Sequence, residues 1–186
     1  MNNNDFCSQY NDIDLEEWKN KACSICALWM AIKIIKKDFD LNVNELLNEA
    51  LDIGAWLQSG FWIHNKITIL AHNHGIAAYT EEFKSIPFGK ETKYSESILN
   101  YGVEKIFNFI KNKNGLVIVS VPKDFLYEDK PHSVLFHSVK EENGERYFVY
   151  NDSNKQNKEE GSNLIINLKD FTIKWRKLAI FLNKLD

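Results

Sequence analysis

The sequence contains no long apolar segment and only three cysteines among its 186 residues. A helix that crosses a bilayer needs about 20 consecutive apolar residues, and no run in the sequence approaches that length. The N-terminal stretch from Met1 to Asp5 also lacks the basic and apolar regions of a secretory signal. Three cysteines cannot all pair, which leaves at least one free thiol and suits a reducing compartment. These absences predict a cytoplasmic protein without a membrane partner.

The sequence has no excess of positive charge, because 23 Lys and Arg residues stand against 26 Asp and Glu, for a net charge of -3. The lysines are spread along the chain, so we expect no basic surface for nucleic acid. With 44% hydrophobic residues, the chain can bury a full core, and its length fits one domain. We therefore predict a single domain over residues 1–186.

Apolar residues recur at helical spacing throughout the first half of the chain. The segment from Cys23 to Lys37 is apolar on most faces as far as Ile35, which is typical of a buried helix. Narrower apolar stripes predict three amphipathic helices. They cover Val43 to Leu51, Trp62 to His74 and Ser95 to Lys113.

The period changes after Gly115, where short runs rich in β-branched residues begin. Leu116 to Val121 is continuously apolar, as in a strand covered on both faces. Asn143-Gly144 is a strong hairpin signal between two such runs. Strands are predicted over Ile76 to Tyr79, Leu116 to Val121, Ser133 to Lys140, Arg146 to Tyr150, Asn163 to Leu168 and Leu178 to Asn183, with a short helix over Lys169 to Trp175.

Helices therefore crowd the first half of the sequence and strands the second. This segregation predicts an α+β domain in which a helical half packs on an antiparallel sheet. The polar stretch from Asp152 to Ser162 is expected to form a surface loop.

Cys23 is placed where a thiol becomes reactive, at the start of the most apolar predicted helix. The first turn of a helix offers unpaired N–H groups and a partial positive charge, both of which favour a thiolate. Cys26 lies one turn further into the apolar run and is expected to be a buried hydrophobe. The sequence therefore predicts Cys23 as the nucleophile, with a plain buried cysteine as the alternative.

A nucleophilic thiol needs a base, a group that orients the base, and donors for the oxyanion. His132 precedes a predicted strand, and Asp152 follows the partner strand of the hairpin, so both are expected at one end of the sheet. Gln9 is predicted to donate its amide to the oxyanion, together with the backbone N–H of Cys23. Their alternatives are a turn residue for Asp152 and a surface polar residue for Gln9.

His137 is the competing base. It lies five positions after His132, so strand alternation predicts that at most one of the two faces the helix. The remaining histidines, His64, His72 and His74, fall in a predicted helix and are expected to be surface or partly buried residues.

The order Gln9, Cys23, His132, Asp152 resembles the papain-like bacterial cysteine peptidases related to the bacteriocin (double-glycine leader) peptidases. Further matching stretches are Ser8-Gln9-Tyr10, Trp18, Met30, Trp62-Ile63-His64-Asn65, His132-Ser133-Val134-Leu135 and Tyr150-Asn151-Asp152. The resemblance implies a papain-like fold, a Cys-His-Asp triad, a peptide or isopeptide substrate, and neither metal nor organic cofactor. A thioester intermediate leaves hydrolysis and transfer to another acceptor as alternatives.

The chain departs from that family beside the nucleophile and at the acid. Ser24-Ile25 follows Cys23 where family members usually have Gly-Pro, and Ser153 replaces the proline after the acid. A side chain at position 24 narrows the approach of a substrate backbone. The second hypothesis is therefore a non-catalytic peptide-binding module of the same fold.

Two further readings start from Cys23-Ser24-Ile25-Cys26, which is a C-x-x-C pair at a helix start. A thiol redox centre of the thioredoxin type needs a hydrophobic strand before the pair, and the polar stretch from Asp14 to Lys21 is no such strand. A zinc site would need a second ligand pair at a finger-like spacing, which the sequence lacks.

Overall fold

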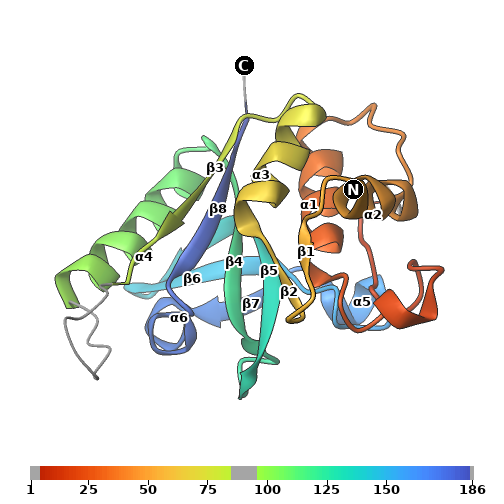
Figure 1. Ribbon diagram of the computed structural model, residues 1–186. Helices are drawn as coiled ribbons and strands as arrows, with labels where there is room; N and C mark the ends of the chain where they lie inside the picture. The colour runs from red at the N-terminus through yellow and green to blue at the C-terminus, as the bar shows by residue number, and fades with distance from the viewer. Residues whose placement is uncertain (1–4, 85–95, 185–186) are drawn as a thin grey trace.

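The computed structural model describes residues 5–84 and 96–184, with a helical first half and a second half rich in strands (Figure 1). The first half contains the short 3₁₀ helix η1 (Glu16–Trp18) and the helices α1 (Cys23–Ile35), α2 (Val43–Asp52) and α3 (His64–Asn73). The later helices are α4 (Glu96–Lys111), α5 (Lys158–Gly161) and α6 (Leu168–Lys174).

The strands form a six-stranded antiparallel sheet in the order β3-β8-β4-β5-β6-β7. They are β3 (Ala78–Glu82), β4 (Gly115–Lys123), β5 (Tyr127–Glu142), β6 (Glu145–Asn151), β7 (Leu164–Asn167) and β8 (Leu178–Asn183). A separate two-stranded hairpin joins β1 (Trp56–Leu57) to β2 (Phe61–Trp62). The α+β class and the antiparallel sheet predicted from the sequence are confirmed.

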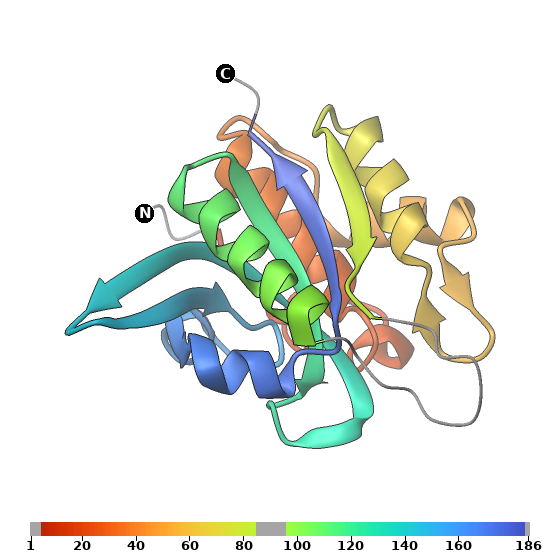
Figure 2. The same cartoon turned by 90° about the vertical axis from the view of Figure 1, so that its left-hand side faces the viewer.

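Helices cover both faces of the sheet, and β4 shows how. Leu116 and Ile118 join the core beneath α1, α2 and α3, whereas Val117 and Val119 join the core beneath α4 and α6. Successive side chains of a strand point to opposite faces, so a continuously apolar strand fills two cores at once. Figure 2 shows α4 along the near face of the sheet and the α1 helix behind it.

The α1 helix is the central helix of the first core. Most of its apolar residues are buried, including Ile25, Cys26 and Leu28, and Trp29, Ile34 and Ile35 are partly buried. It packs on β5 as well as on α2 and α3. Burial on almost every side fixes the position of its first residue, Cys23, against the sheet.

Several predicted boundaries are wrong, for local reasons. The α3 helix starts at His64 because Trp62 pairs with Trp56 in the β1–β2 hairpin. The β5 strand starts at Tyr127, so His132 lies within the strand, opposite Val121, and not before it. The polar stretch that begins at Asp152 is not a plain surface loop, because it contains α5 and buries Asp152 and Ser153.

The hairpin predicted at Asn143-Gly144 connects β5 to β6, and both turn residues have positive φ, 52° and 78°. Such a turn matches the twist of the flanking strands. Among residues 5–84 and 96–184, no helix combines the length and the apolar character that spanning a membrane requires.

Candidate active site

Cys23 is the first residue of α1 and is half-buried, whereas Cys26, one turn later, is fully buried. No side chain caps the helix at Ala22, so no capping bond occupies the N–H groups of the first turn, which lie at the end of the helix that carries Cys23. Burial and the neighbouring thiol Cys7 raise the pKa of Cys26 well above its usual value. The two cysteines of the C-x-x-C pair therefore differ, and all three cysteines are free thiols.

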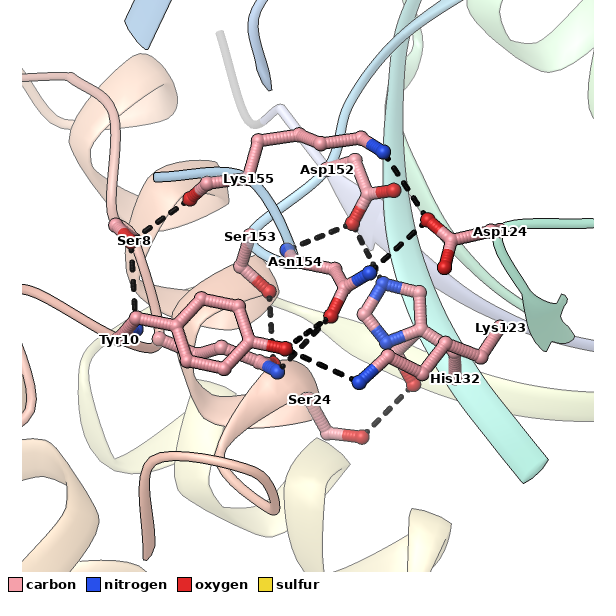
Figure 3. Close-up of polar contacts among 12 residues, drawn as sticks. Ser8, Tyr10, Ser24, Lys123, Asp124, His132, Asp152, Ser153, Asn154 and Lys155 are labelled. Carbon is pink, nitrogen blue, oxygen red and sulfur yellow. Dashed lines mark hydrogen bonds and ion pairs between the residues drawn. The ribbon is translucent and has the colours of Figure 1, made fainter. Parts of the chain in front are cut away.

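The structure brings His132 and Asp152 together. His132 lies in β5, and Asp152 directly follows β6, the neighbouring strand. Their side chains are both buried, and Nε2 of His132 lies 2.6 Å from Oδ1 of Asp152 (Figure 3). With Nε2 bound to the carboxylate, the other ring nitrogen of His132 is left for Cys23, which lines the same cleft.

The electrostatics of these three groups favour a thiolate, an imidazolium and a carboxylate. Burial would raise the pKa of Cys23, but the hydrogen bond and charge of His132, with smaller contributions from Ser133 and Ser24, lower it. Burial would lower the pKa of His132, but Asp152 and Cys23 raise it to about 10. The pKa of Asp152 is lowered against the effect of burial, chiefly by His132.

Gln9 is also buried and lies beside the turn that carries Asp152. Its backbone N–H donates to the carbonyl of Ser153 at 2.9 Å. Its side chain makes two long contacts, from Nε2 to Oδ1 of Asn154 at 3.4 Å and from the Ser153 hydroxyl to Oε1 at 3.5 Å. These contacts hold the Gln9 amide loosely in place.

Asn154 connects the N-terminal segment to the acid turn, and the sequence analysis missed it. Its backbone N–H donates to Oδ1 of Asp152 at 2.8 Å, and its side-chain oxygen accepts from the Tyr10 hydroxyl at 2.6 Å. Its side-chain amide donates to Asp124 at 3.0 Å (Figure 3). The available signal was the Asx-turn chemistry of Asp152-Ser153-Asn154, in which a carboxylate accepts from the N–H two residues later.

The side chain of Ser24, next to the thiol of Cys23, is paired with a residue of β5. It is 3% exposed, and its hydroxyl lies 2.8 Å from the Ser133 hydroxyl in β5 (Figure 3). Ser24, which follows Cys23, is therefore hydrogen-bonded to Ser133, which follows His132, and this contact ties the start of α1 to β5.

Cys23 and His132 open into a cleft of about 640 Å³. The β1–β2 hairpin forms one side of it through Trp56, Phe61 and Trp62. Trp62 is anchored by a hydrogen bond of 2.6 Å from its indole N–H to the carbonyl of Lys21. The hairpin was not predicted, because two-residue strands are too short to show a periodic signal.

His137 lies elsewhere, in a cavity of about 600 Å³ that is also lined by Lys33 and Ile34 of α1. Side chains do alternate along β5, since Leu135 joins the core beneath α1 while Val134 and Phe136 join the other core. His137 shares its cavity with the last turns of α1, whereas His132 shares the cleft with the first residue of that helix. Burial lowers the pKa of His137, and Asn151 only partly offsets this by a hydrogen bond.

The other histidines have local partners. His72 bonds to the carbonyl of Ala78 at 2.8 Å and His74 to Glu49 at 2.7 Å, while His64 lines the cleft. Within the part of the chain that the structure describes, no three His, Cys, Asp or Glu side chains gather as a metal site would require.

Solved structures of two peptidase domains share this architecture. A double glycine motif protease from an AMS/PCAT transporter, solved in complex with its leader peptide, is 14% identical with a TM-score of 0.51, over 87% of this chain and 83% of that one. The peptidase domain of Streptococcus ComA, a bi-functional ABC transporter involved in quorum sensing, is 13% identical with a TM-score of 0.58, over 93% and 96%. No family profile and no curated protein sequence matches the chain. The fold predicted from the sequence is thus confirmed, and the chain has the papain-like fold of these peptidase domains.

Proposed function

We propose that this protein is a cysteine peptidase in which Cys23 is the nucleophile, His132 the general acid and base, and Asp152 the group that orients His132. The observation that carries the proposal is the buried pair of His132 and Asp152, whose side chains lie 2.6 Å apart, in the cleft that the helix-start thiol of Cys23 also lines. These three residues supply the nucleophile, the base and the orienting group that acyl transfer from a peptide needs.

The proposed reaction has two steps. The Cys23 thiolate attacks the peptide carbonyl carbon, His132 gives its proton to the leaving amine, and the C–N bond breaks to leave a thioester. Water, or another acceptor, then gives a proton to His132 and attacks the thioester; the C–S bond breaks, which releases the acyl group on the acceptor and restores the thiolate and the imidazolium. The carboxylate of Asp152 stabilises the imidazolium while the proton is held.

Gln9 is proposed as the side-chain donor to the oxyanion, with the backbone N–H of Cys23 as the second donor. An amide nitrogen carries two hydrogens, and the contact of Gln9 with Asn154 at 3.4 Å engages at most one of them. Removing such a donor typically slows catalysis by about 10²–10³-fold.

A peptide substrate is supported by the similar domains, one of which is described as a double glycine motif protease bound to its leader peptide. Fold alone does not fix activity, so the proposal depends on the site contacts of this chain. The open cleft beside Cys23 is large enough for several residues of an extended peptide.

The test compares two cysteine variants of the intact chain. We expect Cys23→Ala to abolish peptide hydrolysis and rapid alkylation by iodoacetamide at pH 6, since the pKa of Cys23 is lowered. The matched control, Cys26→Ala, removes a buried thiol of the same helix and should keep both properties. Alkylation and peptide binding without hydrolysis would favour the binding-module alternative, and reduction of a test disulfide by the wild-type protein but not by Cys26→Ala would favour the redox alternative.

A further inference from the structure

The cleft beside Cys23 has two chemically different sides. The β1–β2 hairpin supplies aromatic rings on one side. Lysine and arginine side chains line much of the rest of the cleft. They are Lys21, Lys84, Lys123, Lys130 and Arg176.

The aromatic side is supported by ring packing and is partly open to solvent. Trp56 packs edge-on against Trp62 at 5.0 Å and against Trp18 at 5.2 Å between ring centroids. Phe61 is 48% exposed. A supported cluster with one exposed ring offers a surface for a large apolar side chain at little cost in conformational entropy.

The four lysines of the basic side are only partly neutralised by the residues that the structure describes. Glu82, the one carboxylate among the described residues that line the cleft, pairs with Lys84 at 3.2 Å. Lys21 lies over the Trp18 ring at 5.4 Å and Lys130 over the Tyr127 ring at 5.3 Å. Aromatic rings attract an ammonium group but carry no charge that cancels it.

Lys123 is similar: its ammonium group lies 3.0 Å from the Tyr10 hydroxyl and over the Tyr10 ring at 5.8 Å. The cleft is thus positive in a chain whose net charge is -3. A concave site of one sign attracts ligands of the opposite sign and raises their local concentration.

From this contrast we infer that the substrate is an acidic peptide, with Asp or Glu residues near the scissile bond and a large apolar side chain that meets the Phe61 side of the cleft. The inference rests on the proposed peptidase function, because it assumes that the ligand beside Cys23 is a peptide. Electrostatic attraction selects among peptides here, while the aromatic contact sets how a bound peptide is placed.

The test measures binding with the intact Cys23→Ala variant, so that turnover does not interfere. Three dye-labelled peptides share their length and apolar residues and differ only in carrying Glu, Gln or Lys at the flanking positions; fluorescence anisotropy gives their affinities. We expect the Glu peptide to bind about tenfold more tightly than the Lys peptide at about 50 mM salt, and only about twofold more tightly at 0.5 M salt, where screening is strong.

Two substitutions in that background locate the effect. Lys130→Glu should reduce the preference for the Glu peptide about threefold, whereas Lys140→Glu, on the same strand but outside the cleft lining, should leave it unchanged. Phe61→Ser should weaken all three peptides equally. Equal affinity for the three peptides, a preference insensitive to salt, or equally tight binding of a single-stranded oligonucleotide would each overturn the inference.

The two proposals fail in different ways. If the wild-type protein hydrolyses the three peptides at equal rates, the peptidase proposal stands and the acidic preference is wrong. If Cys23→Ala binds the Glu peptide selectively but the wild-type protein hydrolyses none of the three, the acidic preference stands and the peptidase proposal is wrong.

Discussion

The two ends of α1 each meet a histidine of β5, and the two imidazoles behave oppositely. At the N-terminal end, His132 contacts Cys23 and Asp152, and its pKa rises to about 10. Near the C-terminal end, His137 shares a cavity with Lys33 and Ile34, and its pKa is lowered. The same strand and the same helix thus hold one charged and one neutral imidazole.

The opposite pKa shifts of His132 and His137 show how the helix dipole, burial and charged partners compare in size. A helix dipole favours a cation near the C-terminus and an anion near the N-terminus, so the dipole alone would raise the pKa of His137. Burial of His137 outweighs that effect, since its hydrogen-bond partner is the neutral amide of Asn151. For His132, burial acts in the same direction, but a carboxylate and a thiol reverse the result. Ionised partners set the charge of His132, and burial sets that of His137; the position along the helix decides neither.

The largest expected effect comes from removing the carboxylate partner of His132. In Asp152→Asn the amide no longer stabilises the imidazolium, so we expect peptide hydrolysis to fall by at least about 10²-fold and alkylation of Cys23 at pH 6 to slow. Initial rates and iodoacetamide labelling measure the two effects. Glu141→Gln, an equivalent substitution in an exposed ion pair with Lys111 near the other end of β5, is the control and should change neither. Unchanged labelling in Asp152→Asn would contradict the assigned role of the carboxylate.

Much of this site was accessible from the sequence because its signals are local. The apolar run after Cys23 predicted a buried helix, and the Asn143-Gly144 turn predicted that Asp152 returns toward the strand of His132. Gln9 and Asn154 are different, because their contact joins segments 145 positions apart. Nothing in the local pattern of either segment specifies that pairing, and the strand order of the sheet depends on similarly distant contacts.

The second effect concerns stability and pH. The folded-state pKa of His132 is raised above 6.5, so its contribution to stability is fully present below pH 6.5 and is lost as the pH rises toward about 10. We expect wild type to exceed His132→Gln in free energy of unfolding by on the order of a few kcal/mol near pH 6, and the gap to shrink at alkaline pH. Urea unfolding at several pH values measures this gap, and a gap that widens from pH 6.5 to 10 would show that the sign is wrong.

The third prediction gives His137, near the C-terminal end of α1, a charged partner like the one that His132 has. Asn151→Asp keeps the shape of the partner of His137 but gives it a negative charge, so the pKa of His137 should rise by about one pH unit or more. An NMR titration of the imidazole C–H signals follows His137 directly. A pKa of His137 that stays below its usual value in this variant would mean that burial, and not the charge of the partner, decides the charge of His137.

The smallest effect concerns the bond that fixes the N-terminal end of α1 to β5. Ser24→Ala leaves the buried Ser133 hydroxyl without its partner at 2.8 Å, so we expect a loss of about 1 kcal/mol in the free energy of unfolding. The pKa of Cys23 should also rise, because the Ser24 hydroxyl helps to stabilise the thiolate. The double variant Ser24→Ala/Ser133→Ala removes both hydroxyls and leaves neither unpaired. Its loss in free energy of unfolding should therefore be smaller than the sum of the losses in the two single variants. Strict additivity would mean that the two serines act independently, and the contact would then be no more than proximity between α1 and the strand of His132.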